Sequence, residues 1–159
     1  MREIKFRGQI NNVITDNEGN VIKEFKSWVY GDLLHRPNGV LHLLTLKDEG
    51  FYENHAIDPD TISQFTGLKD KSGKEIYEGD LIKAPSGRIY AVIFSTWKHE
   101  EKREFPKVID LYEHTGWCIS LDGVNPCELL DFEVCQGSVI SSVYDNPELL
   151  KGGNHESNV

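Results

Sequence analysis

The sequence predicts a mainly β protein, in which short strands are joined by tight turns. Helical periodicity is almost absent, and short alternating or apolar runs take its place. Gly, Asn and Pro punctuate these runs at short intervals. Hydrophobic residues make up 38% of the chain and charged residues 27%, which is enough apolar material to build a folded core.

The first part of the chain, residues 1–63, is expected to form a β-rich subdomain. Its alternating or apolar runs predict strands at residues 4–7, 21–22, 28–30 and 33–46. Residues 16–20 predict a turn, and Pro37-Asn38-Gly39 breaks the last run into a hairpin. Residues 58–61 fit either one helical turn capped by Asp58 or an extended stretch before Pro59.

Residues 64–151 are expected to form a small closed barrel with a short terminal helix. Predicted strands lie at residues 75–77, 81–83, 89–94, 117–121, 130–134 and 138–144. Turns are expected at residues 70–73 and 85–87, and the charged stretch 98–107 predicts a surface loop. Asn146 and Pro147 predict the start of the helix, and residues 152–159 are expected to be a disordered tail.

Three segments resemble the YopX-like family, whose function is uncharacterised. They are Met1–Arg7, the run from Gln64 to Ile82, which reads QFTGLKDKSGKEIYEGDLI, and the stretch from Val139 to Leu150. Phe65 stands where the family commonly has Tyr, and residues 137–143 depart from its usual pattern. The resemblance implies an origin in phages and prophages of low-GC Gram-positive bacteria and an SH3-like barrel in the C-terminal part. It carries over no catalytic residues.

The net charge of −9 is unevenly distributed along the chain. Residues 1–60 carry −3, residues 61–109 carry +2 and residues 110–159 carry −8. A negative field repels phosphate and disfavours non-specific binding to nucleic acid. The acidic last third is interpreted as a solvated surface, with a contact to a basic partner, imitation of DNA and a contact to the basic middle segment as alternatives.

A candidate interaction surface combines basic and aromatic residues of the middle segment, the pattern that oligonucleotide-binding faces use. It consists of Arg88, Tyr90, Trp97, Lys98, Lys102 and Arg103. Tyr90 shares a strand face with Arg88 and is expected at the surface. Glu100, Glu101 and Glu104 offset the basic charge, so nucleic acid is disfavoured as a partner.

The sequence contains no motif for a metal, a cofactor or catalysis, and we expect none of the three. A two-residue turn at Asn38-Gly39 would pair His35 with His42, about 5 Å apart across the strands, as a candidate metal-binding or pH-sensitive pair. The alternative is an exposed hairpin whose histidines have no role. The three cysteines lack the close spacing of zinc ligands and are expected to be reduced and free of metal.

The leading functional hypothesis is a non-enzymatic phage or prophage accessory protein that serves as a protein-binding or assembly module. The alternative is a nucleic-acid-associated regulator, either a weak binder or an acidic DNA mimic. An odd number of cysteines and the lack of a long apolar run predict a cytoplasmic protein. The strand formed by residues 89–94 has no charge or proline to protect its edge, so a homo-oligomer is expected.

Overall fold

A computed structural model describes residues 3–152 and divides the chain into two compact units, Met1–Gly67 and Leu68–Val159. Antiparallel strands make up most of both units, so the predicted mainly β class is confirmed. One sheet has the strand order β4-β3-β2-β1-β5-β6, and the other has the order β10-β9-β8-β7-β11. The boundary between the units falls within strand β5.

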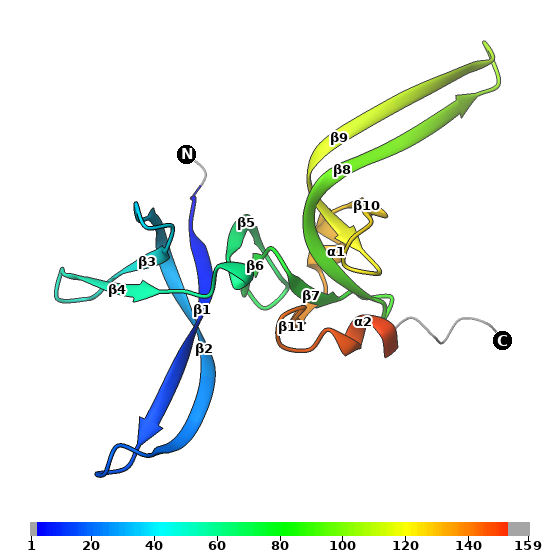
Figure 1. Cartoon of the computed structure of the whole chain (residues 1–159). Helices are drawn as coiled ribbons and strands as arrows, with labels where there is room; N and C mark the ends of the chain where they lie inside the picture. The colour runs from blue at the N-terminus through cyan, green and yellow to red at the C-terminus, as the bar shows by residue number, and fades with distance from the viewer. Residues whose placement is uncertain (1–2, 153–159) are drawn as a thin grey trace. The chain divides into compact units, whose positions relative to one another are not determined.

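The N-terminal unit is an antiparallel meander built on two long strands. Its strands are β1 (Phe6–Thr15), β2 (Val21–His35), β3 (Leu41–Leu46), β4 (Tyr52–Ala56) and β5 (Ser63–Lys69). β1 pairs with β2 along its whole length, whereas β5 pairs with β1 only through Phe6 and Arg7. The far halves of β1 and β2 therefore form a two-stranded hairpin, which Figure 1 shows extending away from β3 and β4.

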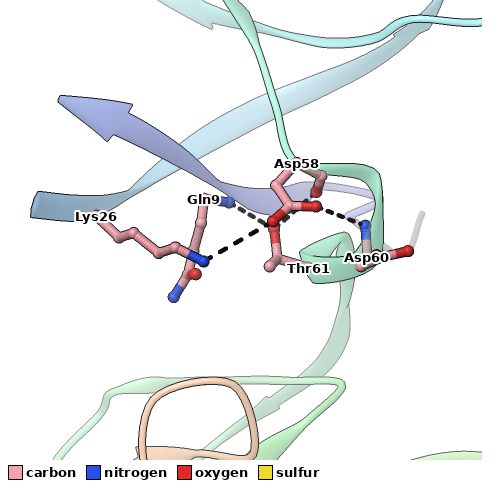
Figure 2. Close-up of polar contacts among 5 residues, drawn as sticks. All are labelled: Gln9, Lys26, Asp58, Asp60 and Thr61. Carbon is pink, nitrogen blue, oxygen red and sulfur yellow. Dashed lines mark hydrogen bonds and ion pairs between the residues drawn. The ribbon is translucent and has the colours of Figure 1, made fainter.

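The short 3₁₀ helix η1 (Pro59–Thr61) is fixed against β1 by a set of polar contacts (Figure 2). The Asp58 carboxylate caps the helix by accepting from the backbone N–H of Asp60 at 3.1 Å. The backbone N–H of Gln9 donates to the Thr61 hydroxyl at 2.8 Å, and Lys26 lies 3.9 Å from the other Asp58 oxygen. Of the two alternatives for residues 58–61, the structure contains the helical turn.

The C-terminal unit packs its core on the two faces of the second sheet. The strands of this unit are β6 (Glu75–Tyr77), β7 (Asp80–Lys83), β8 (Ile89–Arg103), β9 (Val108–Ser120), β10 (Glu128–Leu129) and β11 (Ser138–Ser142), with the helices α1 (Phe132–Cys135) and α2 (Glu148–Gly152). Ile82, Val92 and Ile119 belong to one buried cluster. Leu81 and Ala91 belong to the other, which Leu150 of α2 completes.

Five hairpins of the chain share one turn geometry. In each, the backbone carbonyl of the first residue accepts a hydrogen bond from the backbone N–H of a glycine three positions later. The backbone N–H of the same first residue donates to the backbone carbonyl of the residue that follows the glycine. The five turns are residues 16–20, 36–40, 47–51, 70–74 and 84–88. Each glycine has φ between +81° and +87°, the conformation that glycine adopts without steric cost. The predicted turns at 16–20, 70–73 and 85–87 are therefore confirmed.

Neither sheet closes, so the closed barrel predicted over residues 64–145 is wrong, and an SH3-like arrangement is not confirmed. Closure would require β10 to pair with β11 at the two edges of the second sheet. β10 has only two residues, and the expected strand at 130–134 is replaced by helix α1. This helix begins there because the Asp131 carboxylate accepts from the backbone N–H of Val134 at 2.9 Å, an N-cap that alternating apolar residues do not reveal.

The surface loop predicted over residues 98–107 is also wrong, because β8 continues to Arg103 and β9 begins at Val108. Opposite charges face each other across the two strands. The Lys98 Nζ lies 3.1 Å from a carboxylate oxygen of Glu113, and a guanidinium nitrogen of Arg103 lies 2.8 Å from a carboxylate oxygen of Asp110. Opposite charges paired across two strands stabilise a hairpin, even where each strand by its sequence alone has the charged composition of a loop. The terminal helix is confirmed as α2, which includes Gly152, and residues 153–159 of the predicted tail lie outside the described residues.

Candidate functional site

The outer parts of β8 and β9, residues 94–117, form a long two-stranded hairpin that we call the arm. β7 pairs with β8 only from Ile89 to Ala91, and β10 pairs with β9 only at Cys118 and Ile119. Within the described residues, no third strand accompanies the arm beyond these points. Figure 1 shows the arm extending from the rest of the C-terminal unit.

One face of the arm carries large exposed apolar side chains. Phe94 is 57% exposed, Ile109 59% and Leu111 75%, and the strand register places all three on the same face. The ion pair between Lys98 and Glu113 lies among them. An alternation of apolar groups with polar pairs is typical of a surface that contacts another protein.

The opposite face carries a ladder of rings. The Trp97 ring stacks on His99, with centroids 5.2 Å apart, and on His114, with centroids 6.0 Å apart. His99 in turn stacks on Tyr112 at 6.5 Å. The Trp97 indole N–H donates to the backbone carbonyl of Cys127 at 3.1 Å, which holds the ladder against the body of the unit. This face is therefore ordered by contacts within the chain.

The tip of the arm, residues 102–108, is apolar and basic. The Phe105 side chain is 95% exposed, and Val108 beside it is 40% exposed. Lys102, Arg103 and Lys107 flank Phe105 along the chain, with Glu104 as the acidic residue of the tip.

A groove with a volume of about 820 Å³ lies at the other end of the C-terminal unit, next to α2. Apolar side chains form most of its lining: Leu121, Pro126, Val143, Pro147 and Leu150. Cys127, Asp122 and Lys151 also line it, and Cys127 is an exposed residue whose part-buried thiol donates to the backbone carbonyl of Ile119 at 3.3 Å. Hydrogen bonds from the backbone N–H and side-chain amide of Asn125 hold the pKa of the Asp122 carboxyl well below its usual range, so this rim is negatively charged.

The structure does not bring the six residues of the predicted interaction surface onto one face. Arg88 and Tyr90 line a separate pocket of about 260 Å³, together with Glu128, Asp131 and Glu133. Tyr90 is half-buried, because one side of it packs against the first core cluster, so it lies only partly at the surface.

The other four residues lie on the arm, divided between its two faces. Trp97 and Arg103 belong to the face that carries the ring ladder. Lys98 and Lys102 belong to the apolar face.

The predicted pairing of His35 with His42 is wrong. The structure pairs His35 with Leu41 and His42 with Leu34, so the two histidines fall on opposite faces of the hairpin. The turn contains one more residue than the two-residue turn assumed, because Arg36 and Val40 close it. His42 instead contacts the side chain of Asn54 at 2.6 Å.

Among residues 3–152, no group of three or more His, Cys, Asp or Glu side chains could hold a metal ion. Burial raises the pKa of the Cys118, Cys127 and Cys135 thiols above its ordinary value, which disfavours the thiolate needed for metal binding. The expected absence of metal and cofactor stays a prediction. No helix in the same range is long and apolar enough to cross a bilayer.

Sequence reasoning missed the exposed apolar residues of the arm. Val108, Ile109, Leu111 and Tyr112 sit in a run that mixes apolar residues with Asp110 and Glu113. That mixture was a sign of a two-faced strand, but the dense charge at 98–104 favoured a loop. The lining of the groove comes from three separated segments, which no local pattern connects.

Fold and site together define a mainly β protein of open antiparallel sheets with a long, solvent-exposed hairpin arm. The model of the family described as YopX protein matches residues 14–151, and the chain belongs to that family. This confirms the resemblance seen in the sequence motifs. A comparison with curated proteins finds no match.

Proposed function

We propose that this chain is a non-enzymatic phage or prophage accessory protein, an assembly module that associates with further copies of itself through the arm. The two-stranded arm is the observation that carries the proposal. An isolated two-stranded hairpin is at best marginally stable in water, and this one leaves Phe94, Ile109 and Leu111 exposed on one face. A second copy that covers this face would supply the missing layer.

Energetics support a role for that apolar face in association. Full burial of one Leu, Ile or Phe side chain contributes about 1.5–3 kcal/mol. Three such side chains on one face are a sufficient centre for a protein contact, since a few central residues carry most of the affinity of an interface. The open edges of β8 and β9 in the arm offer additional backbone hydrogen bonds to a neighbouring strand.

Sedimentation of the wild type at micromolar concentration tests the proposal. We expect a species larger than a single chain. Leu111→Lys places a charge on the apolar face of the arm and is expected to shift the protein to the monomer. Because Leu111 is 75% exposed, the substitution leaves the fold intact, which circular dichroism checks.

Phe132→Lys is the matched control, since Phe132 is 79% exposed but lies in α1, away from the arm. This variant is expected to remain an oligomer. A wild type that sediments as a single chain would overturn the proposal. If both variants dissociated to the same extent, the apolar face of the arm would not be the surface that forms the contact.

A further inference from the structure

We propose that the arm tip of one copy docks into the groove beside α2 of a second copy, with Phe105 inserted among the apolar residues of the groove. This inference rests on the proposed self-association and adds to the contact of the apolar face a second contact, between the tip and the groove. It makes the contact head-to-tail, because the tip and the groove are different parts of the C-terminal unit.

The tip is shaped to enter a cavity. Phe105 is 95% exposed at the end of a narrow two-stranded hairpin, and the flanking Val108 adds apolar surface. An aromatic side chain held so far into solvent contributes nothing to the core of its own unit. Burial of such a residue in a pocket is typical of the anchors that dominate protein interfaces.

The groove matches this tip in size and lining. Its volume of about 820 Å³ accommodates a phenylalanine with its neighbours. Leu121 in its lining and Val124 next to it are exposed, as expected of a surface that lacks its partner.

Charge complementarity selects a second copy as the occupant. At the tip, Arg103 is paired with Asp110, and Lys102 and Lys107 outnumber Glu104. The two stretches that line the groove, residues 121–127 and 143–151, hold the carboxylates of Asp122, Asp145 and Glu148 against the single cation Lys151. The ionised Asp122 lies at the rim of the groove. A basic tip and an acidic groove on the same chain attract each other only between copies that pack head to tail.

The tip cannot fill the groove of its own unit, because the arm extends away from α2 (Figure 1). A head-to-tail contact either closes into a ring or continues as a filament. In either assembly, every copy uses its tip once and its groove once.

The test uses a thiol that the groove already contains. In Glu104→Cys, a cysteine stands beside the intact Phe105, and a short bismaleimide can join it to the exposed Cys127 of a docked neighbour. Cys118 and Cys135 are buried and do not compete. We expect covalent dimers and higher multimers on a denaturing gel.

Three matched variants define the result. Adding Cys127→Ser to Glu104→Cys is expected to abolish the crosslink, and adding Phe105→Ser is expected to reduce it at least tenfold. Asn38→Cys, in an exposed turn of the N-terminal unit, is expected to give no crosslink to Cys127.

Sedimentation of the same samples separates this inference from the proposal on which it rests. Multimers in sedimentation without a crosslink that depends on Cys127 would overturn the docking and leave self-association intact. A single-chain species in every sample would overturn both. A crosslink that persists undiminished in the Phe105→Ser background would show that Phe105 is not the anchor.

Discussion

At the scale of the residue, Asp70 is a buried polar side chain that connects two elements of the C-terminal unit. Its carboxylate accepts from the hydroxyl and the backbone N–H of Ser72 and from the backbone N–H of Lys74, within its own turn. It also accepts from the backbone N–H of Val139 at 2.9 Å, which ties the turn to β11. Asp16 occupies the same position in another turn but is exposed and makes its hydrogen bonds within that turn.

Asp70→Ala is expected to lower the free energy of unfolding by about 2–3 kcal/mol, because the buried N–H of Val139 loses its acceptor. Asp16→Ala is the matched control and is expected to have a clearly smaller effect, since water replaces the lost acceptor. Urea denaturation followed by tryptophan fluorescence measures both. Equal losses in the two variants would contradict this account of Asp70.

The same carboxylate makes stability depend on pH. Burial opposes its charge, but the Ser72 hydroxyl and the backbone N–H groups of Val139, Lys74 and Ser72 outweigh burial and lower the pKa of Asp70. A group whose pKa is lower in the folded state stabilises the fold above its unfolded pKa of about 4 and loses this contribution as the pH falls through its folded value.

We therefore expect the free energy of unfolding of the wild type to fall as the pH drops below about 4. Asp70→Asn is expected to begin less stable at neutral pH and to lose less on acidification. Other carboxyls with lowered pKa, such as those of Glu53 and Glu148, keep some dependence in the variant. Denaturation curves between neutral pH and pH about 3 measure the difference, and parallel curves for the two proteins would refute the role of Asp70.

At the scale of the element, one type of turn builds the molecule. The same five-residue turn joins β1 to β2, β2 to β3, β3 to β4, β5 to β6 and β7 to β8. Its glycine at φ between +81° and +87° sets a one-residue bulge, which fixes the register of both flanking strands. A local rule repeated five times therefore determines which side chains face each other.

Gly73→Ala is expected to destabilise the C-terminal unit by about 1 kcal/mol, because a Cβ strains a residue at φ +85°. The space around Gly73 is open, so the effect isolates backbone strain from steric overlap. Gly116→Ala is the control: this glycine also has open space but no positive φ, and no loss is expected. Thermal or urea unfolding compares the two, and a similar loss in both would rule out the strain argument.

At the scale of the whole molecule, the distribution of charge shapes association. The middle of the chain carries +2 and the last third −8, so copies attract through unlike regions while their overall charge of −9 opposes indiscriminate association. The basic tip and the acidic groove are the two regions where this attraction acts at short range.

Salt is therefore expected to shift sedimentation of the wild type from the oligomer towards the single chain, because the Debye length shortens from about 10 Å at 0.1 M to about 3 Å at 1 M. Lys102→Glu, which reverses a charge at the tip, is expected to weaken association at low salt. Glu24→Lys, on the hairpin of the N-terminal unit, is the control for a change of net charge. If the mass of the oligomer did not depend on salt, the chains would still associate, but electrostatic attraction would not be the cause.

The sequence by itself determined the features that depend on neighbouring residues. The mainly β class, the turns at 16–20, 70–73 and 85–87 and the helix after Pro147 follow from turn chemistry, capping and alternation, which act over a few residues. The motifs at both ends of the chain and at 64–82 also indicated the family that the match over residues 14–151 establishes.

Tertiary structure alone decided the features that depend on distant residues. The residues 98–107 form a hairpin because their charges face Asp110 and Glu113 across the arm, and a single strand does not reveal such a pairing. The turn at 36–40 has one residue more than a two-residue turn, and this shifts the pairing register of the two strands by one position. Because such a shift exchanges the two faces of a strand, His35 and His42 lie on opposite faces of the hairpin. The sheet stays open because Asp131 begins a helix where alternation indicated a strand. The arm is decided by contacts between groups that the sequence keeps apart, whereas the turn and the helix are decided by local hydrogen bonds that compete with alternation and become visible only in the folded chain.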